Sequence, residues 1–147
     1  DGRGIETRED EIQILIPAGI ENGEMIRMTG QGEVISGGTA GDLYIKVHVG
    51  PHPFLHREGS HLVMDLEIPL TDALLGIDKI IESVDEKIKI KIPAGVDSGE
   101  ILRVRERGVP VSRGKRGDLL IRIHIRNPKK LSKKARELID ELRKEGI

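Results

Sequence analysis

Aliphatic residues, most of them alternating with polar ones, recur along six short stretches of the chain. Because successive side chains of a β-strand point to opposite faces of a sheet, this pattern predicts strands with one buried face. The predicted strands cover residues 12–16, 43–49, 62–68, 79–84, 88–92 and 119–125. The chain is therefore expected to be mainly β.

The strand at 12–16 should end at Pro17, since proline cannot donate a hydrogen bond to a sheet ladder. Asn22-Gly23 then offers residues that tolerate a turn, and an apolar segment returns at 25–28. The same series recurs between residues 88 and 104, with Ser98-Gly99 at the turn. We therefore expect one β-hairpin in each half of the chain.

Two segments have the pattern of helices. Residues 71–75 form a short predicted helical turn that Thr71 or Asp72 would cap and Gly76 would end. Near the C-terminus a single apolar stripe recurs at helical spacing, between a predicted N-cap at Ser132 and a stop at Gly146. The stripe consists of Leu131, Ala135, Leu138, Ile139 and Leu142. Such an amphipathic helix can dock on its own domain or pair with a second copy, and periodicity does not separate the two.

The chain contains an internal repeat. Residues 12–49 align with residues 88–125 without a gap, at a spacing of 76 residues, and 17 of the 38 aligned positions are identical. Self-similarity of this kind indicates that one structural unit is used twice. We therefore expect two tandem, similar, β-sandwich-like subdomains followed by the C-terminal amphipathic helix.

The two copies are not equally complete. The second is preceded by a strand, a short helix and another strand, whereas only the glycine-rich start precedes the first. The first subdomain is therefore expected to be truncated, with a sheet edge that a missing segment, a partner chain or a client peptide would cover. The expected boundaries are 1–50 for this first subdomain, 51–60 for a linker, 61–126 for the second subdomain and 127–147 for the helix segment.

Composition narrows the class of protein. The 147 residues carry a net charge of −1, with one Tyr, one Phe and no Cys, so aliphatic side chains must build the cores and disulfides are excluded. No apolar stretch is long enough to span a bilayer and no signal peptide is recognised, so a cytoplasmic protein without a membrane partner is expected.

Catalytic and metal-binding patterns are rejected. Asp42 and His48, repeated as Asp118 and His124, lie at opposite ends of one predicted strand, roughly 20 Å apart at about 3.3 Å per residue. They cannot form an Asp/His pair, and the remaining histidines have no metal-ligand spacing. We therefore expect neither an enzyme nor a resident metal.

A basic surface is the main alternative source of function. The segment from residue 103 to residue 134 contains about a dozen Lys and Arg residues and only two carboxylates, Glu106 and Asp118. Such a surface would suit an RNA-binding or ribosome-associated module, with Arg113, Lys115 and Arg116 among its contacts. The aromatic platforms of single-strand recognition are missing, so a nucleic-acid partner is the less favoured interpretation.

Four motifs, in their order and spacing, resemble the C-terminal substrate-binding region of the DnaJ co-chaperones. They are residues 16–23 (IPAGIENG), the glycine elements around Gly32 and Gly41, residues 52–59 (HPFLHREG) and residues 68–76 (IPLTDALLG). The resemblance covers essentially the whole chain. It implies two β-rich subdomains in series, a C-terminal dimerisation helix, a homodimer, and binding of unfolded client proteins.

The resemblance also defines what this chain lacks. The family's J domain, whose His-Pro-Asp motif engages the seventy-kilodalton heat-shock chaperone, is absent, since His52-Pro53-Phe54 is only a look-alike. The cysteine-rich zinc region is absent as well, so no cofactor is expected here, although Asp1-Gly2-Arg3-Gly4 resembles the end of its last motif.

The resemblance implies a client groove on the first subdomain. By position, Ile12 and Ile45 match groove-lining residues, and Ile14 and Val47 are their neighbours on the two strands. The alternative is that these four side chains are ordinary core residues. By the same resemblance, the stripe from Leu131 to Leu142 is the dimerisation surface.

Overall fold

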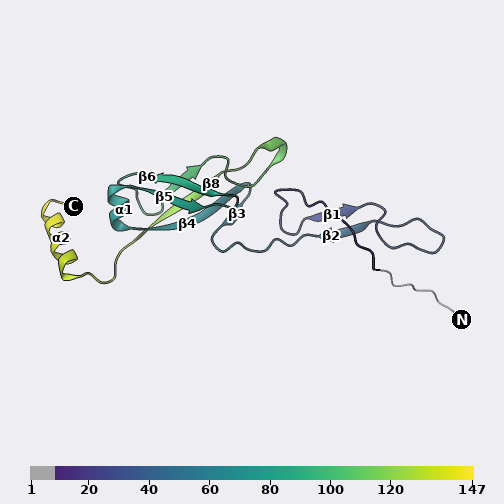
Figure 1. Ribbon diagram of the computed structural model, residues 1–147, viewed down its shortest axis with the longest axis horizontal. Helices are drawn as coiled ribbons and strands as arrows, with labels where there is room; N and C mark the ends of the chain where they lie inside the picture. Colours follow the sequence, from purple (N-terminus) through teal and green to yellow (C-terminus); the bar gives the residue numbers. More distant parts are fainter. Residues whose placement is uncertain (1–8) are drawn as a thin grey trace. The chain divides into compact units, whose positions relative to one another are not determined.

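The structure is a computed structural model that describes residues 9–147. The chain divides into two units, the first ending at Gly50 and the second beginning at Pro51. Unit 1 contains β1 (Met25–Met28) and β2 (Leu43–Lys46), and unit 2 contains all other helices and strands of the described residues (Figure 1).

In unit 1, β1 and β2 pair antiparallel, with Ile26 opposite Ile45. Backbone hydrogen bonds extend this ladder beyond β2, because the Val47 amide donates to the Glu24 carbonyl and the Gly23 amide donates to the Val47 carbonyl, both at 2.8 Å. The glycine-rich loop between the strands narrows at a bridge that joins Val34 to Ala40.

Unit 2 contains two sheets. The larger has the strand order β3-β4-β8-β7, in which β4 and β8 run parallel and the outer pairs antiparallel. These strands are β3 (His56–Glu58), β4 (His61–Pro69), β7 (Ile101–Val104) and β8 (Leu119–Arg126). The smaller sheet pairs β5 (Ile77–Glu82) with β6 (Lys87–Ile92), and α1 (Leu70–Leu75) joins β4 to β5.

One aliphatic core joins the two sheets of unit 2. Leu119, Ile121 and Ile123 of β8 are fully buried, and they share a cluster with Ile90 and Ile92 of β6. The alternation along β8 therefore produces the buried face that its sequence predicts. The mainly β fold with a C-terminal helix is confirmed.

The predicted hairpins are wrong. Strand β6 pairs with β5, and β7 pairs with β8, so residues 93–100 pass from one sheet to the other. After Pro93 the chain bonds to α1, because the Gly95 amide donates to the Ala73 carbonyl at 2.8 Å. Gly99 has the positive φ that its sequence suggests, but its amide extends the β7–β8 ladder through the Ile123 carbonyl.

The strand predicted over residues 12–16 does not form in the structure. Its counterpart, β6, is held by β5, and no strand of unit 1 among the described residues corresponds to β5. Without a ladder partner, an alternating pattern alone does not make a strand.

The predicted helix caps are correct for one of the two α-helices and wrong for the other. The N-cap of α1 is Pro69 with no side-chain cap, so the expected capping by Thr71 or Asp72 is wrong. Helix α2 (Lys133–Lys144) is capped as expected, since the Ser132 hydroxyl accepts a hydrogen bond from the Ala135 amide at 3.1 Å. At its other end Gly146 has φ of 86°, and the Ile147 amide bonds to the Leu142 carbonyl, which closes the helix.

The segment expected as a linker, residues 51–60, includes β3, so its second half is part of the larger sheet. Leu55 is also buried in the core. Because these residues pack and pair, unit 2 begins earlier than the sequence pattern suggests. None of the helices in residues 9–147 has the length and apolar composition needed to cross a lipid bilayer.

Candidate functional site

The repeated aspartates close loops. In unit 1, Asp42 accepts hydrogen bonds from the Gly30 amide at 3.1 Å and from the Arg27 guanidinium at 2.8 Å. This arrangement uses both carboxylate oxygens of Asp42 and holds the glycine-rich loop against β1.

The same arrangement recurs in unit 2. Asp118 accepts from the Glu106 amide at 2.9 Å and pairs with Arg103 at 2.7 Å. The hydrogen bond from Glu106, together with the positive charge of Arg103, lowers the pKa of the Asp118 carboxyl and outweighs the effect of burial. The repeat therefore reproduces individual contacts as well as strand order.

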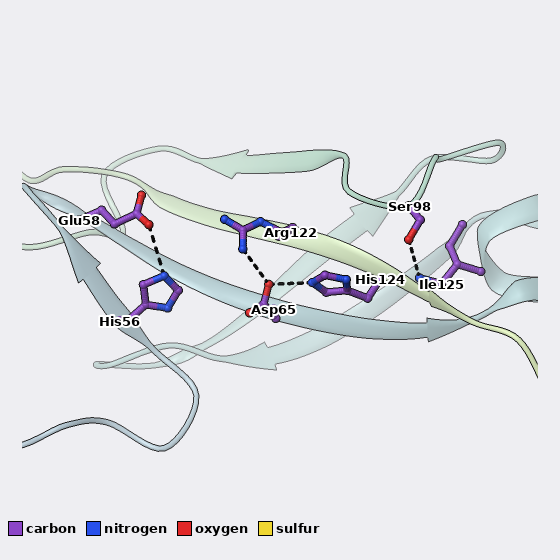
Figure 2. Close-up of polar contacts among 7 residues, drawn as sticks. All are labelled: His56, Glu58, Asp65, Ser98, Arg122, His124 and Ile125. Carbon is purple, nitrogen blue, oxygen red and sulfur yellow. Dashed lines mark hydrogen bonds and ion pairs between the residues drawn. The ribbon is translucent and has the colours of Figure 1, made fainter.

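His124 has a different partner, on the outer face of the larger sheet. Its Nε2 atom lies 2.8 Å from Asp65 Oδ1, which also contacts Arg122 at 3.4 Å (Figure 2). The hydrogen bond with His124 is the main cause that lowers the pKa of Asp65. These half-exposed contacts link β4 to β8, and Asp118 does not take part in them, so His124 and Asp118 do not pair, as their spacing along the strand predicts.

The neighbouring polar contacts are also structural. His56 and Glu58 of β3 pair at 3.4 Å, and the Ser98 hydroxyl accepts from the Ile125 amide at 3.2 Å (Figure 2). Within residues 9–147, no group of three His, Cys, Asp or Glu side chains has the arrangement of a metal site.

The basic surface of unit 2 is partly neutralised by its own carboxylates. Arg103 pairs with Asp118, while Arg107 pairs with Glu86 at 2.9 Å. Arg116 pairs with Asp85 at 2.7 Å. These ion pairs occupy part of the cationic surface from which an RNA-binding module would have to be built.

The face of unit 1 that carries Ile45 and Val47 is less buried than its counterpart. Both side chains are half-buried, as is Ile26 beside them on β1. In unit 2 the corresponding residues Ile121 and Ile123 have no exposed surface at all. The difference arises because the β5–β6 sheet covers that face of unit 2, and the described part of unit 1 has no such sheet.

Strand β2 also has an edge without a partner in the part of the chain that the structure describes. In unit 2, β8 is flanked by β7 on one side and by β4 on the other, and the Leu62 amide donates to the Asp118 carbonyl where β4 begins. In unit 1, β2 is flanked only by β1 among the described strands. An edge of this kind can accept an additional strand.

Residues 12–16 present further apolar surface in unit 1. Ile12 is half-buried, whereas Ile14 is 41% and Leu15 87% exposed. The corresponding strand β6 has Lys87, Lys89 and Lys91 at the outward positions, a common protection of sheet edges. Unit 1 has Glu11, Gln13 and Leu15 at these positions, and so lacks the lysines.

Two contributors to the unit 1 face are not among the residues that the sequence predicts for the groove. Ile26 and Met28 of β1 stand opposite Ile45 and Leu43 of β2, and both are half-buried. Their alternation with Met25 and Arg27 indicates one buried face of β1. The predicted hairpin, however, paired β1 with residues 12–16 and not with β2. The register between β1 and β2 is the signal that would have identified them.

The stripe on α2 remains half-exposed. Leu131, Leu138, Ile139 and Leu142 are 37–49% exposed, and no residue of α2 is buried. The five stripe residues line an open groove of about 560 Å³, together with Leu70 and Leu74 of α1. The groove therefore offers apolar surface that unit 2 does not cover by itself.

Comparison with known proteins identifies the family. The family model described as the DnaJ C terminal domain matches residues 3–128. The chain belongs to the DnaJ family. It is 41% identical over 140 residues to a protein named Chaperone protein DnaJ from Psychrobacter arcticus (strain DSM 17307 / VKM B-2377 / 273-4), an alignment that covers 94% of this chain. The chain corresponds to 37% of the length of that relative.

The β-rich fold of this chain is therefore that of the DnaJ C-terminal domain. The match confirms the family that the four sequence motifs indicate. The motif remnant predicted at Asp1-Gly2-Arg3-Gly4 lies outside the described residues.

Proposed function

We propose that unit 1 binds exposed apolar segments of unfolded client proteins. The observation that carries this proposal is the contrast between the two copies of the repeat. Ile45 is half-buried beside the open edge of β2, whereas its counterpart Ile121 is fully buried under a second sheet. A site that must receive apolar side chains needs such accessible aliphatic surface.

The proposed mode is strand addition. An extended client segment would bond to the open edge of β2, which provides affinity through the backbone and no strict sequence requirement. Its alternate side chains would pack on Ile45 and Val47, with Ile12 and Ile14 completing the apolar surface. Two kinds of support coincide here. One edge of β2 has no partner among the strands of residues 9–147, and half-buried aliphatic side chains lie on one face of the same strand.

We also propose that the chain forms a homodimer through the α2 stripe of Leu131, Ala135, Leu138, Ile139 and Leu142. The half-exposed stripe and the apolar groove that it shares with α1 support self-association. Two linked client sites would act jointly on one unfolded chain, so that weak individual sites gain avidity.

The remaining parts of the proposal follow from the family. The chain would act without catalysis and without a cofactor of its own, in the cytoplasm. Cooperation with the seventy-kilodalton heat-shock chaperone would require the J domain of a longer protein, since no His-Pro-Asp motif is present in this sequence.

Suppression of aggregation of a chemically denatured protein tests the client site. Ile45→Asp should abolish the suppression, because a carboxylate on the apolar face opposes burial of client side chains. Lys46→Asp is the matched control, since it places the same side chain at the next position of β2, on the opposite face. Equal activity of wild type and Ile45→Asp, with unit 1 shown to be folded, would reject the site.

Light scattering over a range of concentrations tests the dimer separately. Leu138→Asp should give a monomer with an intact unit 2, because Leu138 is 49% exposed and contributes nothing to the buried core. A wild-type chain that stays monomeric at every accessible concentration would reject the dimer.

A further inference from the structure

The two asparagines of the chain differ in the residue that follows them. Asn22 precedes Gly23 and Asn127 precedes Pro128, and both asparagines are exposed. An asparagine loses its side-chain amide when the backbone nitrogen of the next residue attacks its Cγ carbon. Glycine has no Cβ to obstruct this attack, whereas a proline nitrogen carries no hydrogen and is held in a ring. Asn22 is therefore the asparagine with a reactive neighbour.

Hydrogen bonds restrain both groups that would react. The Asn22 Oδ1 atom accepts from the Val49 amide at 2.9 Å, and the Gly23 amide donates to the Val47 carbonyl at 2.8 Å. Attack requires the Gly23 nitrogen to lose its proton and to approach Asn22 Cγ, so the bond to Val47 must break first. Both bonds lie beyond the end of β2, where the β1–β2 ladder finishes. Since the ends of elements open more readily than their centres, Asn22 becomes reactive when this end opens.

Unit 2 makes the same turn without a reactive amide. The Ser98 hydroxyl accepts from the Ile125 amide at 3.2 Å (Figure 2), and the Gly99 amide donates to the Ile123 carbonyl at 2.7 Å. Each contact is the equivalent, 76 residues later, of a contact in unit 1. A hydroxyl therefore serves as the acceptor in this turn, and the fold does not require the amide of Asn22.

We propose that Asn22 is a modification site, at which opening of the end of the β1–β2 ladder leads to loss of the side-chain amide. Water is the co-reactant, and no oxidant or reductant takes part. The folded turn protects Asn22 through its two hydrogen bonds, so the extent of modification records how often this end of unit 1 has opened.

The reaction has two steps. In the first, the Gly23 nitrogen gives its proton to a base in solvent and bonds to Asn22 Cγ; the bond from Cγ to Nδ2 breaks, Nδ2 takes up a proton, and ammonia leaves a cyclic succinimide. In the second, water opens the ring. Breaking the bond between the nitrogen and Cγ gives aspartate, whereas breaking the bond between the nitrogen and the main-chain carbonyl carbon gives isoaspartate. Overall, one water is consumed and one ammonia is released.

The two products affect unit 1 differently. Aspartate keeps a side-chain oxygen where Asn22 accepts from Val49. Isoaspartate adds one carbon to the main chain before Gly23, so the bonds to Val47 and Val49 no longer fit a single register. Because Val47 lies on the proposed client face, isoaspartate should weaken client binding. This consequence rests on the proposed function, whereas the modification itself does not.

Peptide mass spectrometry of the full chain tests the modification. The chain is kept at mildly alkaline pH, either folded in buffer or unfolded in urea, and the Asn22 amide is followed with time. At about fivefold for each of the two hydrogen bonds, the folded chain should lose this amide about twentyfold more slowly than the unfolded chain. Asn127 is the internal control and should keep its amide in both. An Asn22 amide that persists in the unfolded chain overturns the chemistry, and equal rates overturn the protection by the ladder.

Ageing of a matched variant tests the consequence. Asn22→Ser has the residue that unit 2 uses at this turn, so it should fold like wild type without the reactive amide. After ageing, wild type should lose suppression of client aggregation in proportion to its isoaspartate content, measured by labelling with a protein isoaspartate methyltransferase. Asn22→Ser should keep its suppression and carry no label at residue 22.

The outcomes separate this inference from the proposed function. Aged wild type that contains isoaspartate at residue 22 and suppresses aggregation as well as fresh protein overturns the consequence for client binding, as does equal loss of suppression in the aged Asn22→Ser chain. Fresh wild type that fails to suppress aggregation overturns the proposed function instead, and the amide loss at Asn22 is still measured by its mass.

Discussion

A glycine that occurs at the same position in both repeats tests whether the two copies differ as described. Gly117 lies where β4 begins beside β8, and a Cβ there would overlap the Ser60 carbonyl. The equivalent Gly41 has room, since among residues 9–147 a Cβ would meet only the Glu33 carbonyl oxygen, at 3.8 Å. Neither glycine has a positive φ, so Gly→Ala tests steric contact at both positions.

Only the substitution in unit 2 should lower the free energy of unfolding. Gly117→Ala would push Ser60 away and weaken two hydrogen bonds, from the Val109 amide to the Ser60 carbonyl and from the Leu62 amide to the Asp118 carbonyl. At about 1 kcal/mol for each bond and about 2 kcal/mol for overpacking, unit 2 should lose about 4 kcal/mol. Gly41→Ala should be neutral or should stabilise by up to about 1 kcal/mol, because alanine restricts the unfolded chain.

Thermal unfolding followed by far-ultraviolet circular dichroism measures the effect on both units. For a unit of this size, the loss at Gly117→Ala corresponds to a decrease in Tm of about 20 °C. The fluorescence of Tyr44, the single tyrosine, reports unit 1 separately because it lies on β2. Equal destabilisation by the two variants would show that the edge of β2 is covered like that of β8, and the reasoning would be refuted.

Two further predictions concern local contacts. Because the folded-state pKa of Asp118 is lowered, its carboxylate stabilises unit 2 above its unfolded-state pKa of about 4, and this contribution should disappear as the pH falls through the folded-state value. Urea unfolding midpoints of wild type and Asp118→Asn should therefore differ at pH 7 and move together as the pH falls below about 4, and a constant difference would contradict the assignment. Ser132→Ala should destabilise α2 by about 1 kcal/mol, which would appear as faster hydrogen exchange of the Ala135 amide. Ser132→Asn should keep this amide protected, because asparagine can also cap a helix. Identical exchange rates in the two variants would exclude the cap.

Local signals in the sequence were reliable where the structure depends on local contacts. The alternation at 119–125 corresponds to β8, and the apolar stretch at 62–68 corresponds to β4. Ser132 and Gly146 mark the ends of α2 because an N-cap and a left-handed C-terminal glycine satisfy helix groups within a few residues.

Long-range pairing was not predictable in the same way. Strand β8 pairs in parallel with β4, 57 residues earlier, and nothing in the pattern of either strand identifies the other as its neighbour. A tight turn at Ser98-Gly99 suggested a hairpin, whereas the chain crosses between sheets there. Turn residues such as Ser98 and Gly99 indicate only where the backbone can bend. Which strands pair with each other depends on the packing of the whole core.

The candidate site shows the same limit. Ile45 and Ile121 are identical residues at equivalent positions of the repeat, but only Ile121 is fully buried. The difference in burial comes from the strands that surround each copy, so it cannot be predicted from the sequence of the repeat itself. The resemblance to the DnaJ family supplied the role proposed for Ile12 and Ile45, and the structure adds Ile26 and Met28 to the same face of β1 and β2.

Amide hydrogen exchange on adding an unfolded client chain tests the central proposal most directly. New protection is expected in residues 43–47, along the open edge of β2, and in residues 12–16. Little change is expected in β6 and β8, whose equivalent positions are already paired or buried. Protection that appears only in unit 2, or none in unit 1 at saturating client, would contradict it.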